Sequence, residues 1–250
     1  MTTGPDDTPP PRLWIACPTY GGMMYNASVT SLLKFQKVAF KRKLDIHIDV
    51  VTGDSLITRF RNYMVSRFLE HPAFSHFLFL DVDIGFAPET IFNLMDANKD
   101  VIGGVYPIKE VFWDRLADRP PSTPAEMESA ATRFVVKRGP YADEPMVNGV
   151  GRAEYVGTGF MMIRRPVFDR LKAAYPDLRY GAQHVGGAAT GDNLYAFFDS
   201  GIDRETGTYL SEDYMFCKRW RAIGGDVWIY GAAEFRHVGP RVFRGTYSGA

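Results

Sequence analysis

Apolar and polar residues follow two alternating patterns along the chain, one typical of strands and the other of helices. Short apolar runs predict strands at residues 12–17, 46–51, 76–82 and 100–107. Between these runs, the helical spacing of apolar residues predicts helices at residues 27–43, 56–70 and 88–98. Because strands and helices take turns, the pattern predicts an α/β fold with a mainly parallel central sheet, flanked by helices on both faces.

The buried faces of the two longer helices are predicted from the positions of their apolar residues. In the first helix we expect the buried side to hold Val29, Leu32, Leu33 and Phe40. In the second we expect it to hold Leu56, Ile57, Phe60, Met64 and Phe68, with Ser55 as the N-cap. On this second helix Arg61 lies at the margin of the apolar stripe, whereas Arg59 and Asn62 lie on the polar face. Of these three side chains, Arg61 is therefore the one expected to be drawn inward.

The second half of the chain is less regular. Residues 109–152 are polar and proline-rich, and residues 180–209 form another long irregular segment, rich in Gly, Asp and aromatic residues. Between and after these segments the pattern predicts a strand at 153–165 with a Gly-Thr-Gly interruption, a helix at 166–176, a helix from the N-cap Ser211 to Gly224, and a strand at 226–231. We see no internal repeat and no domain boundary, so we expect a single domain at residues 12–250 after a disordered leader at residues 1–11.

Charge and composition exclude several classes of protein. The formal net charge is zero, which argues against a general nucleic-acid-binding protein, so no nucleic-acid partner is expected. No apolar run reaches about 18 residues, so no membrane span is expected. The leader lacks the basic start and apolar centre of a signal peptide, and the two cysteines, Cys17 and Cys217, are far apart in the sequence. These features favour reduced, inert thiols and a cytoplasmic location.

Two aspartates, Asp81 and Asp83, follow the apolar run of the third predicted strand, with only Val82 between them. Residues i and i+2 of a strand point the same way, so both carboxylates are expected at one small volume. Two like charges that close raise each other's pKa unless a cation lies between them, and such oxygen ligands suit Mg²⁺ or Mn²⁺. Ligands of parallel sheets bind beyond the carboxyl ends of the strands, so the pair predicts half of a metal site facing a cleft. The alternative is that both aspartates are solvated residues ahead of the next helix.

Three further positions carry side chains that suit such a site. His237 follows the last predicted strand, and imidazole is a common ligand of Mn²⁺-type ions, although a surface histidine is the alternative. Glu212 and Asp213 begin a helix, where the helix dipole favours acids in any case, but a carboxylate that faces the cleft can act as a general base. Thr19 and Tyr20 leave the first strand, where a nucleoside base or ribose would be met.

Together these elements resemble the GT-A class of nucleotide-sugar-dependent glycosyltransferases, particularly small members related to family 2. The resemblance covers residues 12–237 and rests on "CPTY", "GDSLITRFRN", "LDVDIGF", "GGVYP", "VGTGFMMIRR", "YLSEDYMFCKRW" and "HVG" in this order and spacing. It implies a GT-A, Rossmann-like fold with a nucleotide-binding half at 12–108 and an acceptor-binding, catalytic half at 109–250. The implied activity is a hexosyltransferase that uses Mn²⁺ or Mg²⁺ and a nucleotide-sugar donor, with UDP as the expected nucleotide. A glycan, glycolipid or other hydroxyl compound is the implied acceptor, in polysaccharide biosynthesis.

The resemblance also implies a role for each matching residue. Asp83 binds the metal, Asp81 contacts the ribose or sugar and reaches the metal through water, and His237 is a further metal ligand. Asp213 is the expected catalytic base, with Glu212 as second choice, which makes the transfer inverting at the sugar carbon. The other positions implied to bind the donor are Pro18, Thr19, Tyr20, Asp54, Arg59, Arg61, Asn62, Val82, Gly157, Thr158 and Gly159. At the glycines, small residues are expected to let the backbone approach the substrate.

Three alternatives remain open from the sequence. A retaining glycosyltransferase would share the metal site but would not need Asp213 as a base. A non-catalytic, nucleotide-binding relative would require a broken metal site, and the sequence shows no sign of one. A sugar-phosphate nucleotidyltransferase would require a glycine-rich G-x-G-T-R loop after the first strand, and that loop is missing.

Overall fold

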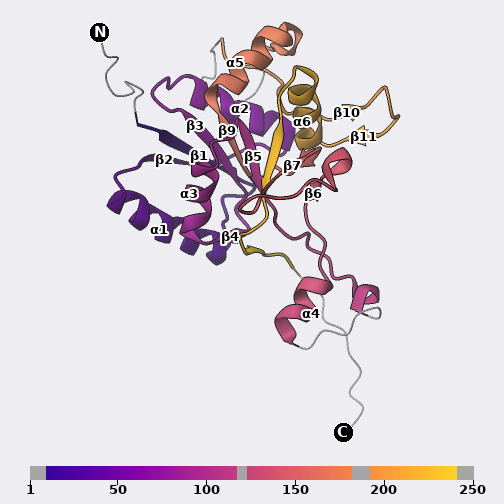
Figure 1. Cartoon of the computed structure of the whole chain (residues 1–250). Coiled ribbons are helices and arrows are strands. Elements are labelled where there is room, and N and C mark those ends of the chain that lie inside the picture. Colours follow the sequence, from indigo (N-terminus) through magenta and orange to yellow (C-terminus); the bar gives the residue numbers. More distant parts are fainter. Residues whose placement is uncertain (1–9, 117–122, 182–191, 241–250) are drawn as a thin grey trace, which may run out of the picture.

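A seven-stranded mixed sheet forms the centre of the structure (Figure 1). The computed structural model describes residues 10–116, 123–181 and 192–240 of the chain. In sheet order the strands are β2 (Asp45–Thr52), β1 (Arg12–Thr19), β3 (His76–Leu80), β9 (Phe160–Arg164), β5 (Val101–Gly104), β12 (Val227–Tyr230) and β7 (Val150–Ala153). Strands β9 and β7 run against the direction of the other five. The predicted α/β fold with a mainly parallel central sheet is therefore confirmed.

Helices cover both faces of this sheet. Their bounds are α1 (Asn26–Lys41), α2 (Ile57–Leu69), α3 (Pro88–Asp96), α4 (Pro124–Ala130), α5 (Arg165–Ala174) and α6 (Glu212–Ala222). One apolar core joins the sheet to α2, α5 and α6, and a second joins it to α1 and α3. Along β1 and β3, Trp14, Phe77 and Phe79 lie in the first core, whereas Leu13 and Leu78 lie in the second. This is the alternation of side chains expected of strands that are buried on both faces.

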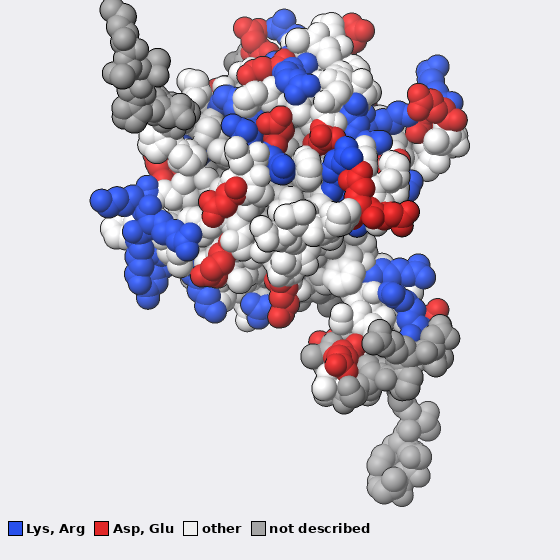
Figure 2. Space-filling view, viewed as in Figure 1, with Lys and Arg blue, Asp and Glu red and all other residues white. Residues whose placement is uncertain are grey.

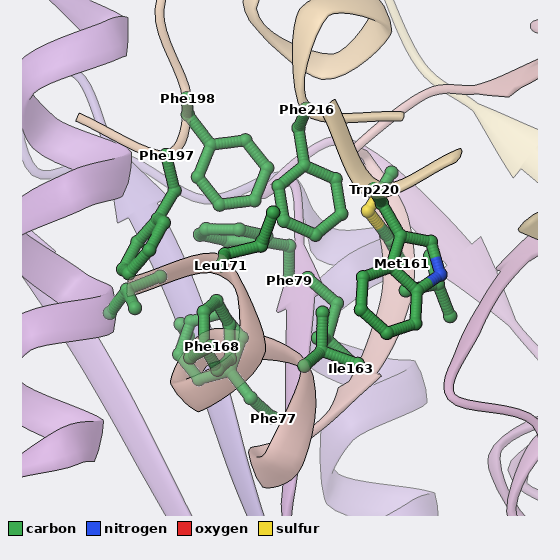
Figure 3. Packing of buried hydrophobic residues seen from close by; sticks show 14 of the residues in the cluster. Phe77, Phe79, Met161, Ile163, Phe168, Leu171, Phe197, Phe198, Phe216 and Trp220 are labelled. Atoms are coloured by element: carbon green, nitrogen blue, oxygen red, sulfur yellow. The ribbon is translucent and has the colours of Figure 1, made fainter. Parts of the chain in front are cut away.

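Residues 192–209, the described end of the predicted irregular segment, are held to the first core by the aromatic packing of Phe197 and Phe198, which Figure 3 shows. The ring of Phe198 stacks on that of Phe216 with 4.5 Å between centroids, and it meets Phe79 edge-on at 5.0 Å. The side-chain amide of Asn62 donates to the carbonyl of Phe198 and accepts from its N–H, both at 2.8 Å. Asn62 is buried and fixes this segment against α2. The prediction that Asn62 lies on the polar face of its helix is therefore wrong.

Short elements complete the fold. Three two-stranded sheets pair β4 (Ile84–Phe86) with β13 (Phe235–His237), β6 (Val136–Lys137) with β8 (Tyr155–Val156), and β10 (Gly201–Ile202) with β11 (Tyr209–Leu210). Single turns of 3₁₀ helix lie at Trp113–Leu116, Gly139–Tyr141 and Pro176–Leu178. The pairing of β4 with β13 is the one that matters for the site, because it brings the end of the described chain back to the residues that follow β3.

Several predicted strand boundaries are wrong. The third strand ends at Leu80 instead of residue 82, and the fourth ends at Gly104. The strand predicted at 153–165 is divided among β7, β8 and β9, which belong to two different sheets. The turn at Thr158 and Gly159 breaks the run, so that β9 can enter the central sheet between β3 and β5. Strands from both halves of the chain therefore share one sheet, and the division of tasks between the halves stays a prediction.

The predicted buried face of α1 is wrong except at Leu32. Val29, Leu33 and Phe40 are 38%, 62% and 84% exposed. The buried side instead holds Ser28, Ser31, Leu32, Phe35 and Ala39, most of them small. Ser31 explains why a polar residue is favoured on this side, because its hydroxyl accepts a hydrogen bond from the N–H of Phe86 at 2.9 Å and donates to the carbonyl of Ala27.

The start of α2 also differs from the prediction. Its N-cap is Leu56 and not Ser55, and the N–H of Leu56 donates to the carboxylate of Asp54 at 2.9 Å. The first two residues of the predicted stripe, Leu56 and Ile57, are exposed, so the prediction that they are buried is wrong. The rest of the stripe, Phe60, Met64 and Phe68, is buried as predicted.

Other predictions about the ends of the chain and of α6 have mixed outcomes. Ser211 is the N-cap residue of α6, and Gly224 ends the helix with a φ of 80°, both as predicted. Residues 1–9 of the predicted leader lie outside the described residues. Within the described part of the chain, no helix has the length and apolarity needed to cross a bilayer.

The packing of Gly104 yields the first prediction. A Cβ atom added at Gly104 would lie 2.2 Å from Cζ of Phe235, the first residue of β13. We expect Gly104→Ala to lower the free energy of unfolding by about 1–3 kcal/mol, because the ring and β13 must shift. Urea denaturation measures the effect. The matched control is Gly181→Ala, where an added Cβ meets nothing within 4 Å. Equal stabilities of the two variants would contradict the packing described.

Candidate active site

The carboxyl edge of the central sheet gathers most of the residues singled out from the sequence. Asp81 directly follows β3, and its N–H donates to the carbonyl of Gly159 at 2.9 Å, which joins it to the start of β9. Asp81, Val82 and Asp83 form a turn between β3 and β4, so the expectation that they continue a strand is wrong. Because the chain turns here, the two carboxylates bind different cationic partners.

Asp81 shares the guanidinium of Arg61 with Glu212. Arg61 Nη2 lies 3.2 Å from Asp81 Oδ1, and its Nε lies 3.1 Å from Glu212 Oε1. The Arg61 residue is only 5% exposed, so its predicted inward position is confirmed. Burial alone would lower the pKa of Arg61, but the charges of Asp81 and Glu212 outweigh it and raise the pKa. Arg61 Nη1 is buried and has no hydrogen-bond partner among the described residues.

Asp83 lies between Lys109 and His237. Lys109 Nζ donates to Asp83 Oδ2 at 2.5 Å, and His237 Nε2 lies 3.4 Å from Asp83 Oδ1. This second oxygen is buried and has no hydrogen-bond partner in the described part of the chain. Burial favours the neutral carboxyl, but His237 and Lys109 outweigh it and lower the pKa of Asp83. Asp83 is therefore held as an anion.

The position of His237 follows from the pairing of β13 with β4. His237 lies opposite Ile84 in this ladder, and the N–H of Val238 donates to the carbonyl of Asp83 at 2.9 Å. His237 Nδ1 lies 2.7 Å from the carbonyl of Pro107, so Nδ1 carries the proton. Nε2 is therefore the ring nitrogen that faces Asp83, and a histidine held through Nδ1–H in this way is oriented as metal-binding histidines are.

These two side chains fit a divalent cation. Asp83 Oδ1, which has no hydrogen-bond partner among the described residues, faces Nε2 of His237 across 3.4 Å, so a cation placed between them can bind both atoms. Among the residues that the structure describes, no three His, Cys, Asp or Glu side chains cluster closely enough to hold a metal ion by themselves. Mg²⁺ and Mn²⁺ commonly bind one or two protein ligands and complete their shell with water and substrate phosphate, so two ligands are compatible with such a site.

Asp213 differs from the other acids at this edge because no cation pairs with it among the described residues. Its Oδ1 accepts hydrogen bonds from the hydroxyl of Ser211 and from the N–H of Tyr214. Burial, followed by the charge of neighbouring Glu212, raises the pKa of Asp213 above its ordinary value. A carboxylate with a raised pKa is a stronger base, whereas Glu212 is held by Arg61.

The segment at Gly157, Thr158 and Gly159 packs under the ring of Tyr106. The N–H of Gly159 donates to the hydroxyl of Tyr106 at 3.0 Å. A Cβ at Gly157 would lie 2.3 Å from this hydroxyl, and one at Gly159 would lie 2.7 Å from Cζ of the ring. The glycines are therefore required by Tyr106 itself, whatever the substrate. Burial and then the charge of Asp81 raise the pKa of Tyr106, which keeps its hydroxyl protonated.

The residues predicted to bind the donor near β1 and β2 include both buried and exposed side chains. Pro18 and Thr19 are buried, and the Thr19 hydroxyl bonds the carbonyl of Val51 at 2.9 Å and the hydroxyl of Thr52. Tyr20 is exposed, and the half-exposed Arg59 binds the carboxylate of Asp54 at 2.6 and 2.8 Å. The hydrogen bonds from Arg59 lower the pKa of Asp54.

The structure adds two residues to the candidate site and shows the contacts of Val82 and of the two cysteines. Lys109 and Tyr106 were not among the residues predicted for the site, because only the fold brings them to Asp83 and Gly159. The carbonyl of Val82 accepts a hydrogen bond from the N–H of Tyr25, which fixes the turn to the start of α1. Cys17 and Cys217 are buried free thiols with raised pKa values, which agrees with inert cysteines.

The chain is similar in structure to solved glycosyltransferases. No family model and no curated protein matches the sequence. A protein from STIV, A197, is 13% identical, with 95% of this chain and 99% of that chain covered and a TM-score of 0.48. TarS from S. aureus is 14% identical (88% and 35% covered, TM-score 0.44). A Drosophila β-1,4-galactosyltransferase 7 variant in complex with manganese, UDP-Gal and xylobiose is 12% identical (96% and 77% covered, TM-score 0.41). At this level of identity these likenesses assign no residue and no substrate to the present chain.

The shared guanidinium generates the second prediction. Replacing Arg61 with Met leaves Asp81 and Glu212 without their cation, so we expect a loss of about 3–5 kcal/mol in the free energy of unfolding. The matched control is Arg164→Met, which breaks an exposed pair with Asp100 and should cost about 1 kcal/mol or less. Urea denaturation compares the two. If Arg61→Met lowers the free energy of unfolding no more than the control does, the ion pairs of Arg61 with Asp81 and Glu212 do not stabilise the fold as described.

Proposed function

We propose that the chain is a metal-dependent glycosyltransferase, which moves a sugar from a nucleotide-diphosphate sugar to an acceptor hydroxyl with inversion. The observation that supports this most directly is that Asp83 Oδ1 and Nε2 of His237 face each other at 3.4 Å, with Nδ1 of the ring held by the carbonyl of Pro107. A carboxylate oxygen and an imidazole nitrogen are held together by a cation between them, which is either a proton on Nε2 or a bound metal ion. The carboxyl edge of the sheet is where such folds bind ligands.

Asp83 and His237 are the proposed ligands of Mn²⁺ or Mg²⁺, with Asp81 reaching the ion through water. Held by these residues, a divalent cation would supply positive charge to stabilise the departing diphosphate. Lys109 holds the second oxygen of Asp83, so it competes with the ion and has to release at least part of this contact. Its ammonium group then lies close enough to bind a diphosphate oxygen.

Asp213 is the proposed general base. It would take the proton of the acceptor hydroxyl as that oxygen attacks the sugar carbon. Its raised pKa and the absence of a cationic partner support this role, whereas Glu212 serves to hold Arg61. The hydroxyl of Ser211 and the N–H of Tyr214 orient the carboxylate through Oδ1 and leave Oδ2 for the acceptor.

The nucleotide, expected to be UDP, is proposed to lie across the ends of β1 and β2. Exposed Tyr20 can stack on the base, and Asp54 with Arg59 can bind the base or ribose. Backbone groups of Pro18, Thr19 and Val82 would contribute, as would the glycine segment at Gly157–Gly159. Arg61 Nη1 is a buried donor without a partner and is available to the donor sugar or phosphate. The polar groups of Asn62 bind Phe198, so its proposed contribution is to position the segment at 180–209.

The third prediction tests the metal and nucleotide together. Calorimetric titration with Mn²⁺ and UDP should give metal-dependent nucleotide binding, and Asp83→Ala should weaken it at least about tenfold because an anionic ligand is lost. Lys109→Met should instead bind Mn²⁺ more tightly than the unaltered chain, because the competing ammonium group is removed.

The control for this titration is Asp169→Ala, which alters an exposed acid on α5. UDP binding by Asp83→Ala that equals binding by this control would exclude the proposed metal site. A panel of nucleotide sugars with Mn²⁺, followed by measurement of released nucleoside diphosphate, identifies the donor.

The fourth prediction concerns the base. Asp213→Asn should lower the transfer rate by about 10²–10⁴-fold, because the proton acceptor is lost, while metal-dependent UDP binding is retained. In the unaltered enzyme the rate should fall as the pH drops through the pKa of Asp213. Because burial raises that pKa, the fall should begin at a higher pH than for an ordinary aspartate. Asp169→Asn, which alters an exposed acid, is the control and should turn over normally. Near-normal turnover in Asp213→Asn as well would show that Asp213 is not the general base.

A further inference from the structure

An exposed apolar stripe on α1 has no partner within the described structure. Val29, Leu33 and Phe40 are 38%, 62% and 84% exposed, and the helical spacing places them on one side of the helix. The opposite side of α1 makes the contacts with the second core through Leu32, Phe35 and Ala39. Single apolar residues on a surface need no explanation, whereas an apolar stripe along one side of a helix is typical of helices that bind a partner or a membrane surface.

Lysines flank this stripe. Lys34, Lys37 and Lys41 are exposed and lie next to the apolar residues on the solvent side of the helix, and Lys43 follows its end. None of these four lysines forms an ion pair with another described residue. Residues 8–44 contain no Asp or Glu. Figure 2 shows Lys and Arg side chains gathered over the part of the molecule where Figure 1 shows α1. We call Val29, Leu33, Phe40 and the lysines 34, 37 and 41 the α1 outer face.

The exposed apolar surface continues beyond the start of α1. Met23 is 73% exposed and Tyr25 is 42% exposed, in the loop that leads from β1 to the helix. This loop leaves the same carboxyl edge of the sheet that holds Asp81, because β1 and β3 are parallel neighbours. Met23 and Tyr25 therefore add exposed apolar residues between the edge of the site and the start of the helix.

The chemistry of this face matches one kind of partner. A helix with an exposed apolar stripe, adjacent lysines and no acidic residues is complementary to the apolar interior and negative head groups of an anionic bilayer surface. A second copy of the chain fits less well, because a twofold contact would place the same lysines of both copies against each other. A nucleic acid would leave the apolar stripe without a counterpart.

We propose that the α1 outer face docks on the surface of an anionic lipid bilayer. The apolar stripe enters the boundary between head groups and acyl chains, and the lysines bind the negative head groups. The helix lies along the surface and does not span it, as its length of 16 residues and its lysines require. This proposal does not depend on sugar transfer, since it concerns a surface that no residue of the candidate active site contributes to.

Sedimentation with vesicles tests the proposal. We expect the full chain to co-sediment with vesicles of phosphatidylglycerol and phosphatidylcholine at low salt, and to stay in solution with vesicles of phosphatidylcholine alone. Binding should weaken as salt is added, because head-group attraction is screened. The triple variant Lys34→Gln, Lys37→Gln, Lys41→Gln should lose affinity on the order of 100-fold, at about fivefold for each lysine. Leu33→Gln with Phe40→Gln should lose binding at least about tenfold.

The matched control is Ile202→Gln with Arg204→Gln, which removes one exposed apolar residue and one exposed cation from the β10–β11 hairpin. We expect this control to bind vesicles as the unaltered chain does. Equal binding to the two kinds of vesicle, or equal losses in the control and the α1 variants, would overturn the proposal. So would a dimer in sedimentation equilibrium that the α1 substitutions abolish, because a second copy would then cover the face.

Discussion

The guanidinium of Arg61 holds together parts of the structure that are far apart in the sequence. It comes from α2 and binds Asp81 at the end of β3 and Glu212 at the start of α6. All three groups are largely removed from water, so each charge would be unfavourable without the others. Phe79 lies beneath the guanidinium, 5.1 Å from its carbon, and fixes its plane above the sheet. Together with the core packing of Phe216 and Trp220, this side chain joins α6 to the sheet edge at the candidate site.

The acids at the sheet edge differ in their cationic partners. Asp81 and Glu212 share the single positive charge of Arg61, and Asp83 forms an ion pair with Lys109 through one oxygen. The other oxygen of Asp83 faces Nε2 of His237, and Asp213 forms no ion pair with another described residue. Asp83 and Asp213 are the acids proposed to bind a metal and to accept a proton.

The sequence was sufficient for the elements whose residues interact locally or form strong apolar runs. β1 and β3 could be predicted because buried strands are apolar throughout, β2 because apolar residues alternate along it, and the end of α6 because Gly224 has a local signature. The antiparallel position of β9 could not be predicted, because apolar content carries no information about direction. The α1 face was misassigned because the pattern shows which residues are apolar but not what is available to cover them. The apolar residues that this leaves exposed form part of the α1 outer face, which is proposed to contact a bilayer.

Only part of the candidate site could be predicted, because some of its residues carry a local sequence signal and others do not. Asp81 and Asp83 could be identified because they follow a recognisable apolar run, His237 because it lies beyond the last predicted strand, and Arg61 because it lies at the margin of the apolar stripe of α2. Lys109 and Tyr106 lie in an irregular stretch after β5, and only the pairing of β13 with β4 explains their importance. The glycines at 157 and 159 were expected to approach a substrate, but their first contact is with Tyr106. Such contacts between distant segments arise from the completed fold and leave no periodic signal.

The central claim is that the carboxyl edge of the sheet exists to hold a cation that binds a diphosphate. A crystal structure of the chain with Mn²⁺ and UDP tests this most directly. The account predicts an ion within about 2.1 Å of both Asp83 Oδ1 and His237 Nε2, with the diphosphate in its remaining positions and Lys109 moved away from the ion. An ion bound elsewhere, or a diphosphate bound with Lys109 still on Asp83 and no metal beside it, would contradict the account.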